Sequence, residues 1–495
     1  MREMANSDRL TGLDTSFLHL ERHGAHMHIA SCLVFEGSAP PYEEFAQHIN
    51  SRLHLVPRYR QRLAEVPFGQ GRPVWVDDPH FKLGYHLRHS ALPAPGSNME
   101  LSGLCGRVFS TQLDRAKPLW EIYLVDGLAG NRFALLAKTH HALVDGVSGM
   151  DLTAVLFDLA EDAIPLEAPN VEWVAQPAPS SAELLGEALI ERATVPAEMA
   201  RGLRSMVRRP RRTVDWLASQ AAGIGNLAFD GTEQAPETPL NVAIGPHRRF
   251  TWVTADLSQL KEIKNQLGGT VNDVVLTIVS GALGSFLRSR GHPTRDLVLR
   301  AMVPVSIRPQ TEHGTLGNQV AAMWAHLPVG VSDPKQALAL VSDSMSHVKD
   351  SGQAVGAHAL TELTGFAPQT LMSQAARLVP RQRFFNLVVT NVPGPQFPLW
   401  LMGRRLVEIY PMVPLAERQA LGIAVISYDG KVCFGFNADW DAIPDLELLA
   451  EDLRNSLADL TATARKDGKP SRAQRGTSKS KRRSTATAAP VNLKA

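Results

Sequence analysis

Two adjacent histidines, His140 and His141, are followed after three intervening residues by Asp145 and Gly146. An imidazole titrates near neutral pH, so it can take a proton from a hydroxyl group and later give it to a leaving group. The Asp145 carboxylate can fix the loop by pairing with a cation or with backbone N–H groups, and Gly146 permits backbone angles that other residues resist. Because the pattern fixes four positions, it is more specific than a lone histidine. It predicts general-base chemistry at one of the two imidazoles.

The flanking segments place this pattern at the end of a strand. Residues 133–139 form a short apolar run that suits a buried strand. Leu152, Val155, Leu156 and Leu159 then recur at the spacing of an amphipathic helix. Loops at the carboxyl ends of strands are common sites of chemistry in α/β proteins. Neighbouring strand residues point in opposite directions, so we expect the two histidines to differ in role. The alternative interpretation is that both are merely polar loop residues.

A second polar position is predicted at the start of a buried helix. Asn272 is a good N-cap, Asp273 suits the first turn, and the residues up to about Arg288 are apolar on almost every side. Asn272 has two interpretations, a plain helix cap or an amide that faces a substrate carbonyl and stabilises an oxyanion.

Two further elements are predicted near the end of the chain. Residues 421–428 and 431–436 are typical of a β-hairpin with Asp429-Gly430 as its turn. Pro444 opens a last amphipathic helix.

Composition limits the classes of protein to consider. The 495 residues are 44% hydrophobic and 20% charged, which is ordinary for a globular chain with a large core. The formal net charge is +2 and aromatic residues make up 6%, so nothing suggests a base-stacking surface, and nucleic acid is not an expected partner. The three isolated cysteines favour reduced thiols. Because we find neither an apolar leader nor an apolar run of about 18 residues, we expect a cytoplasmic protein that meets lipid only from its surface.

Changes in composition divide the chain into four parts. Residues 1–166, with the histidine pair, and residues 247–463 are each predicted to form a folded domain. Residues 167–246 begin rich in Pro, Ala and Ser and then become basic, which indicates a helical connector. Residues 464–495 contain too few large apolar groups to offset the entropy of ordering, so we predict a disordered tail.

The basic segments leave two questions open. The connector places arginines among leucines and Trp216, a composition that suits contact with an anionic lipid surface. The alternative is a solvated linker packed between the domains. The basic tail would attract any polyanion, so its role is left open.

The histidine segment resembles the HHxxxDG motif of the bacterial wax ester synthase / acyl-CoA:diacylglycerol acyltransferase family. The resemblance extends over about residues 8–462, with matching blocks in the expected order: Leu10–Leu18 with Met27-His28, Pro118–Glu121, Gly245–Phe250, Asn272–Leu276, Pro304–Pro309 and Asn391–Pro395.

The resemblance implies an α/β fold of the two-domain, CoA-dependent (chloramphenicol-acetyltransferase-like) type, with mixed sheets, helices and a site between the halves. It makes His141 similar to the general base of the family and Asp145 similar to its structural aspartate. Arg308 is a plausible cation for Asp145, and we group it with Asn272 and Asp273 as candidate substrate-binding residues. Pro118 and Trp120 are interpreted as structural, and Asn391–Pro395 as a rigid loop near the channel.

The implied activity is transfer of a long-chain acyl group from acyl-CoA to a diacylglycerol, to a long-chain alcohol, or to both. Acyl-CoA is then a substrate, and no cofactor or metal is expected, since the histidine pair has no accompanying Cys or Glu at ligand spacing. The expected location is the cytoplasm, peripheral to a membrane or lipid droplet. Two alternatives stay open: a lipid-droplet coat or tether without activity, and a carrier-dependent condensation-type enzyme with the same motif.

Overall fold

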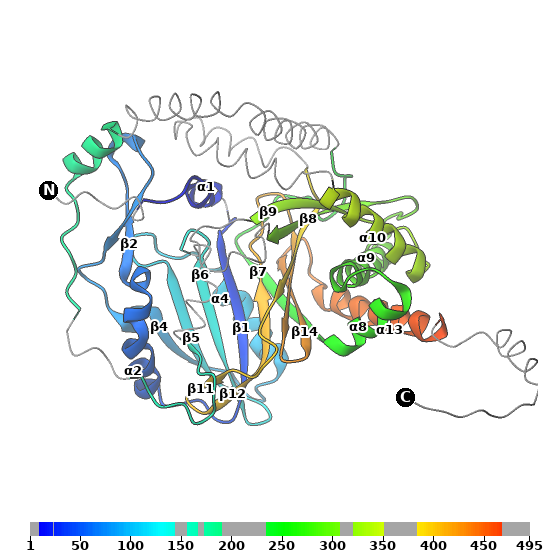
Figure 1. The fold of residues 1–495 in the computed structure, drawn as a ribbon, viewed down its shortest axis with the longest axis horizontal. Coiled ribbons are helices and arrows are strands. Elements are labelled where there is room, and N and C mark those ends of the chain that lie inside the picture. Colours follow the sequence, from blue (N-terminus) through cyan, green and yellow to red (C-terminus); the bar gives the residue numbers. More distant parts are fainter. Residues whose placement is uncertain are drawn as a thin grey trace, which may run out of the picture.

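Two mixed β-sheets of six strands each form the framework of the protein, and helices cover them (Figure 1). The computed structural model describes residues 9–22, 24–143, 156–166, 173–190, 234–306, 320–350 and 384–467. The principal helices are α1 (Gly12–Leu20), α2 (Tyr42–Arg52), α3 (Leu83–His86), α4 (Asn98–Ser110), α8 (Leu257–Leu267), α9 (Val271–Ser289), α10 (Pro334–Asp350) and α13 (Leu446–Asp467). The strands are β1 (His28–Glu36), β2 (Gln61–Ala64), β3 (Val74–Asp77), β4 (Leu87–Ala91), β5 (Trp120–Leu128), β6 (Arg132–His140), β7 (Arg248–Asp256), β8 (Leu299–Ser306), β9 (Val320–Leu327), β10 (Leu387–Pro393), β11 (Trp400–Leu401), β12 (Arg404–Met412), β13 (Leu421–Tyr428) and β14 (Lys431–Asp439).

The first sheet has the strand order β11-β12-β1-β6-β5-β4. Its central strands β12, β1, β6 and β5 are antiparallel neighbours, while β4 is parallel to β5. The predicted strand at 133–139 is confirmed as β6, whose residues from Phe133 to His140 are all buried. Strands β11 and β12 come from the second half of the chain, so the two halves share this sheet.

The second sheet has the order β7-β14-β13-β10-β8-β9, with β10 parallel to both β13 and β8. The predicted hairpin is confirmed as β13 and β14, joined by Asp429 and Gly430 at φ of 43° and 79°. Positive φ at both central residues matches the right-handed twist of the strands. With its mixed sheets and covering helices, the molecule has the expected α/β class.

Helices α8, α9, α10 and α13 lie together beside the second sheet (Figure 1). The predicted buried helix is confirmed as α9, which packs against α13 and α10. The described chain has one helix, α9, that is long and apolar enough to cross a membrane, but 72% of that stretch is buried inside the protein. The last helix is confirmed as α13, although it runs through Asp467. The first residues of the predicted tail, from Ala464 to Asp467, are therefore helical.

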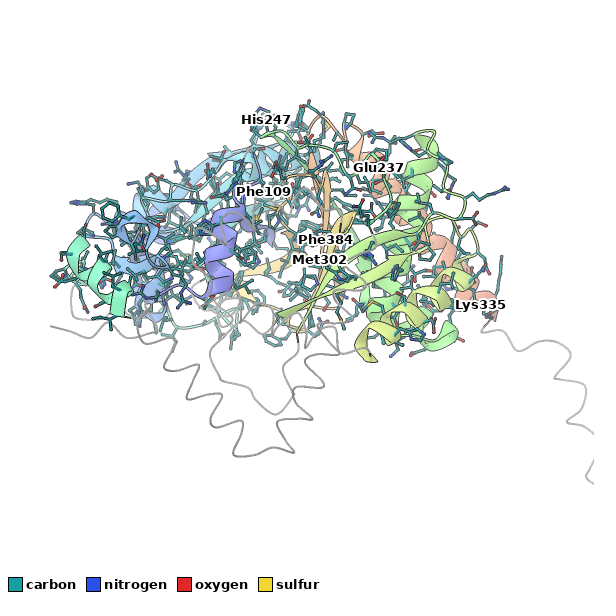
Figure 2. All side chains as sticks on the ribbon, turned by 90° about the horizontal axis from the view of Figure 1, so that it is seen from above. Phe109, Glu237, His247, Met302, Lys335 and Phe384 are labelled. Carbon is teal, nitrogen blue, oxygen red and sulfur yellow. The ribbon has the colours of Figure 1, made fainter. Side chains whose placement is uncertain are left out.

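Helix α4 joins the two sheets. Its Phe109, near the middle of the molecule in Figure 2, contacts the ring of Phe250 on β7 edge to face at 5.0 Å between centroids. A shared apolar cluster also includes Cys32 of β1 and Met412 of β12. One prediction is wrong at this level: the helix expected through Leu159 does not continue past Leu156 in the described residues, where Asp158 instead forms a β-bridge with Trp400.

Candidate active site

The histidine pair lies where β6 ends. His140 is the last residue of the strand, opposite His28 of β1, and its N–H donates to Leu119 at 2.9 Å. The His141 N–H donates to the Met27 carbonyl at 2.8 Å, and the Leu143 N–H donates back to the His140 carbonyl at 2.9 Å. The chain therefore turns out of the sheet directly after His140, as the sequence predicts.

The His140 imidazole is part of the protein interior. The residue is 1% exposed, and its Nδ1 accepts a hydrogen bond from the Ala142 N–H at 3.0 Å. A neutral imidazole that accepts at Nδ1 carries its proton on Nε2. That Nε2 faces the Glu21 carboxylate, with 3.7 Å to Oε2. These contacts make His140 a residue that shapes the turn.

The His141 imidazole has different surroundings. The residue is partly exposed, and its ring stacks on Phe17 of α1, with 3.8 Å between centroids and 20° between planes. Its Nδ1 is buried and has no hydrogen-bond partner among the described residues. Burial lowers the pKa of His141 to about 4; its own backbone partly offsets the shift and His140 adds to it. At neutral pH the ring is uncharged and has a lone pair available, as a general base requires.

The sequence did not identify the Glu21 carboxylate behind the pair. Its side chain is 2% exposed and accepts from the Met27 N–H at 3.2 Å and from Arg115 Nη2 at 2.6 Å. Burial raises the pKa of Glu21, but His140 and Arg115 outweigh this and hold it well below the ordinary range. The only available sequence signal was the resemblance of this N-terminal block to the family.

The second polar position lies at the start of α9, where the predicted N-cap is wrong. Thr270 caps the helix and forms a capping box with Asp273, whose Oδ2 accepts from the Thr270 N–H at 2.8 Å. Asp273 Oδ2 also accepts from Ser342 at 3.2 Å, so the structure gives this carboxylate a capping role. Asn272 is therefore not the N-cap, so capping does not explain why an asparagine occupies this position.

The Asn272 side chain contacts Asn391 of β10, which lies 119 positions further along the chain. Asn391 Nδ2 donates to Asn272 Oδ1 at 3.0 Å. The segment from Asn391 was interpreted as a rigid loop, but its first three residues belong to β10 and pair with β13. With its oxygen occupied, the Asn272 amide keeps its N–H donors for another acceptor.

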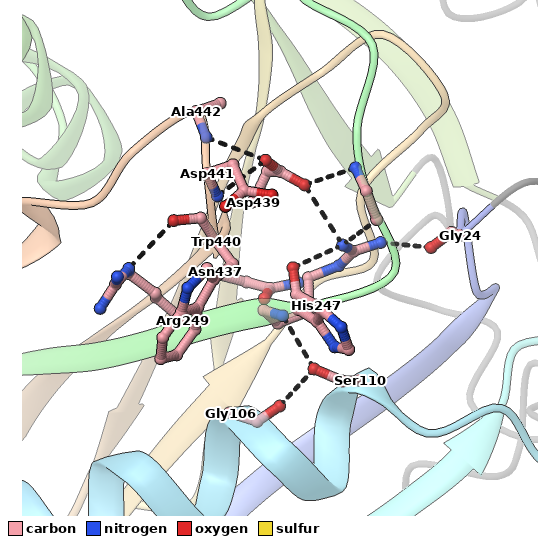
Figure 3. Close-up of polar contacts among 12 residues, drawn as sticks. Gly24, Gly106, Ser110, His247, Arg249, Asn437, Asp439, Trp440, Asp441 and Ala442 are labelled. Carbon is pink, nitrogen blue, oxygen red and sulfur yellow. Dashed lines mark hydrogen bonds and ion pairs between the residues drawn. The ribbon is translucent and has the colours of Figure 1, made fainter.

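The histidine region and the second half of the protein are in contact. Phe17, which stacks on His141, also packs against the apolar cluster that contains Val274 and Val275 of α9, and Met27 belongs to that cluster. The loop before Met27 is held from the other side by Arg248, whose guanidinium donates to the Gly24 carbonyl (Figure 3). The base candidate thus lies at the junction of the two halves.

Three predicted site residues, Asp145, Gly146 and Arg308, lie outside the described residues. Their roles, and the pairing of Asp145 with Arg308, stay predictions. Trp120 of the Pro118–Glu121 block is buried and donates its indole N–H to the Tyr59 carbonyl at 2.8 Å, which fits a structural role. Within the described ranges, no group of three His, Cys, Asp or Glu side chains could hold a metal ion.

Comparison with known proteins identifies the family of this chain. The model of the wax ester synthase/diacylglycerol acyltransferase catalytic domain matches residues 10–275, and that of the WS/DGAT C-terminal domain matches residues 316–461. A putative diacylglycerol O-acyltransferase of Mycobacterium bovis is 32% identical over 469 residues, which cover 93% of this chain and 97% of the relative. A putative diacylglycerol O-acyltransferase of Mycobacterium tuberculosis is 33% identical over 472 residues, covering 92% and 90%.

Solved structures agree with the sequence relatives. The wax ester synthase/diacylglycerol acyltransferase of Marinobacter aquaeolei VT8 is similar with a TM-score of 0.64 and 27% identity, covering 92% of this chain and 99% of that one. The starter condensation domain of rhizomide synthetase shares the fold, with a TM-score of 0.56 at 14% identity, covering 92% and 94%. The chain belongs to the wax ester synthase/diacylglycerol acyltransferase family of acyltransferases.

Proposed function

We propose that this protein transfers a long-chain acyl group from acyl-CoA to the hydroxyl of a diacylglycerol or a long-chain alcohol, with His141 as the general base. The observation that carries the proposal is the partly exposed His141 ring at the end of β6, stacked on Phe17, with a pKa that burial lowers to about 4. Family membership and the diacylglycerol O-acyltransferase names of the relatives support the substrate class.

The proposed reaction needs one proton carrier and no covalent enzyme intermediate. His141 takes the proton as the hydroxyl oxygen attacks the thioester carbonyl. An Asn272 N–H stabilises the negative charge on the tetrahedral intermediate. The intermediate collapses to the ester as the C–S bond breaks, and the imidazolium returns its proton to the CoA thiolate. Acyl-CoA is a substrate in this scheme, and we propose no cofactor.

We also propose that the protein works in the cytoplasm at the surface of a membrane or lipid droplet. The described part of the connector supports this, because the helical segment 181–190 exposes Leu189 and Ile190. Exposed apolar groups suit contact with lipid. The charged residues of this segment, Glu183 and Glu187, are acidic, so the proposed attraction to an anionic surface depends on the arginines further along the connector. The arginines and Trp216 of the connector lie outside the described residues.

A single assay tests both proposals. Purified protein is given palmitoyl-CoA with either dipalmitoylglycerol or hexadecanol in neutral or anionic vesicles, and released thiol is followed with time. We expect turnover with at least one acceptor, faster on anionic vesicles, and a loss of about 10²- to 10⁴-fold in His141→Ala, because that is the usual contribution of a general base.

The results separate the alternatives. Equal rates on neutral and anionic vesicles would argue against the lipid contact. Unchanged activity in His141→Ala would refute the assignment of the base. No turnover with either acceptor would favour the inactive coat or tether.

A further inference from the structure

We propose that Glu21 is a positioning residue that fixes the backbone on both sides of His141 and thereby aims its imidazole. This inference rests on the proposed role of His141 as the base. Glu21 follows α1 directly and is its C-cap residue, whereas His141 lies far along the chain at the end of β6. The carboxylate reaches the histidine by two separate routes.

The first route passes through Met27, the residue before β1. Glu21 Oε1 accepts from the Met27 N–H at 3.2 Å, and the Met27 carbonyl accepts from the His141 N–H at 2.8 Å. Met27 precedes β1, so this pair extends the contact between β1 and β6 by one residue. Glu21 thus binds the residue whose carbonyl accepts from the His141 backbone.

The second route passes through the turn after the base. Glu21 Oε2 lies 3.7 Å from His140 Nε2, the ring atom that carries the proton. The opposite ring atom, Nδ1, accepts from the Ala142 N–H at 3.0 Å. A negative charge on one side of the imidazole favours this tautomer, and the tautomer fixes the peptide that follows His141.

The carboxylate is itself held in place. Arg115 donates to Oε2 from Nε at 2.9 Å and from Nη2 at 2.6 Å, and Nη2 also donates to the Leu18 carbonyl at 2.7 Å. Because His140 and Arg115 outweigh the effect of burial on the pKa of Glu21, the group is ionised at neutral pH. A charge-assisted pair of this kind fixes the side chain more firmly than a neutral hydrogen bond would.

The described residues between Glu21 and Met27 are held by several contacts. Arg22 and Ala25 exchange backbone hydrogen bonds at 3.2 and 2.6 Å. Arg248 of β7 binds the carbonyl of Gly24, which is labelled in Figure 3. A Cβ on Gly24 would come within 2.6 Å of the Gly245 carbonyl oxygen. These contacts of the described loop residues support the transmission of a displacement of the carboxylate to the backbone at His141.

The test replaces the carboxylate with its closest neutral analogue. Glu21→Gln keeps the size and one acceptor oxygen but turns an N–H₂ group toward the donors of Arg115 or Met27. Misplacement of a reacting group by about 1 Å can cost on the order of 10²-fold in rate. We expect kcat with palmitoyl-CoA and the better acceptor to fall by about that factor, with KM for palmitoyl-CoA within about twofold of the parent.

Asp158→Asn is the matched control. Asp158 is also a carboxylate paired with an arginine, Arg52, and its side chain is 10% exposed; none of its hydrogen bonds or ion pairs involves His140 or His141. Both variants are compared per folded enzyme after thermal unfolding has been measured, so that a general loss of stability is seen in both. The positioning role predicts a fall in kcat for Glu21→Gln alone.

Three outcomes would overturn the inference: equal falls in kcat for the two variants, a Glu21→Gln enzyme with parental kcat, or a change confined to KM. His141→Ala in the same series keeps the two proposals distinguishable. If His141→Ala is active, the proposed base is wrong. If His141→Ala is inactive while Glu21→Gln has full activity, only the role of Glu21 fails.

Discussion

The interiors of the two halves differ in their chemistry. The first half buries ionisable side chains around the end of β6 that carries the histidine pair, among them Glu21, His28, Glu121, Lys138 and His140. Among the described residues, the second half buries fewer ionisable side chains, namely Arg248, Asp273, Arg300 and Asp439, and its core around α9 is an extended apolar cluster. Hydrogen bonds fix the orientation of buried polar groups, and close apolar packing resists deformation, so we interpret the first half as the part that orients groups and the second as the stiff part.

The contrast explains how the base candidate is arranged. Neighbouring residues at the end of β6 have separate tasks: His140 is enclosed and hydrogen-bonded, whereas His141 is partly exposed and stacked on Phe17. The apolar core of the second half packs on Phe17 from the far side. A rigid apolar neighbour both fixes the ring and keeps it uncharged, because burial disfavours the imidazolium.

The largest expected effect concerns stability in the apolar half. Leu283 of α9 is fully buried, so Leu283→Ala should lower the free energy of unfolding by about 2–5 kcal/mol, from lost burial and the cavity left behind. Leu448→Ala on α13 is the matched control, since Leu448 is 55% exposed. Urea unfolding gives the values, and kcat per folded enzyme should be unchanged in both. A selective loss of kcat in Leu283→Ala would break the contrast between a stiff half and an orienting half.

A smaller free-energy effect is expected at Asn272, the polar side chain at the start of α9. Asn272→Ala should lower kcat by about 10²- to 10³-fold, as loss of one oxyanion donor does, with little change in stability. Thr270→Ala in the same helical turn is the control. It removes the side-chain cap and should cost about 1 kcal/mol of stability without a comparable loss of kcat. The oxyanion role is wrong if steady-state kinetics show the two variants to be alike.

Local patterns predicted most of the elements that frame the site. The apolar run before the histidines, the all-round apolar helix, the hairpin and the last helix are each confirmed, since each depends on residues close in sequence. The N-cap of α9 was predicted at the wrong residue. Thr270 and Asp273 have the spacing of a capping box, so the signal was present in the sequence. Asn272 was chosen instead because Asn is also a common N-cap residue.

Contacts between residues far apart in the chain could not be predicted from local sequence patterns. Nothing in the composition of residues 400–412 indicates that β11 and β12 join the first sheet, because strand pairing depends on partners far along the chain. The same holds for Glu21 beside His140 and for Asn391 beside Asn272. The domain boundaries at 166, 246 and 463 stay predictions.

The pH dependence of kcat/KM tests the central claim most directly, because this ratio reports the ionisation of the free enzyme. The pKa of His141 is lowered to about 4, so the base stays unprotonated down to well below pH 6. Assays between pH 5 and 8, each with a sample returned to neutral pH to check for denaturation, should give a flat profile with no acid limb near 6.5. A fall to half activity near pH 6.5, the ordinary value for an exposed imidazole, would contradict the account.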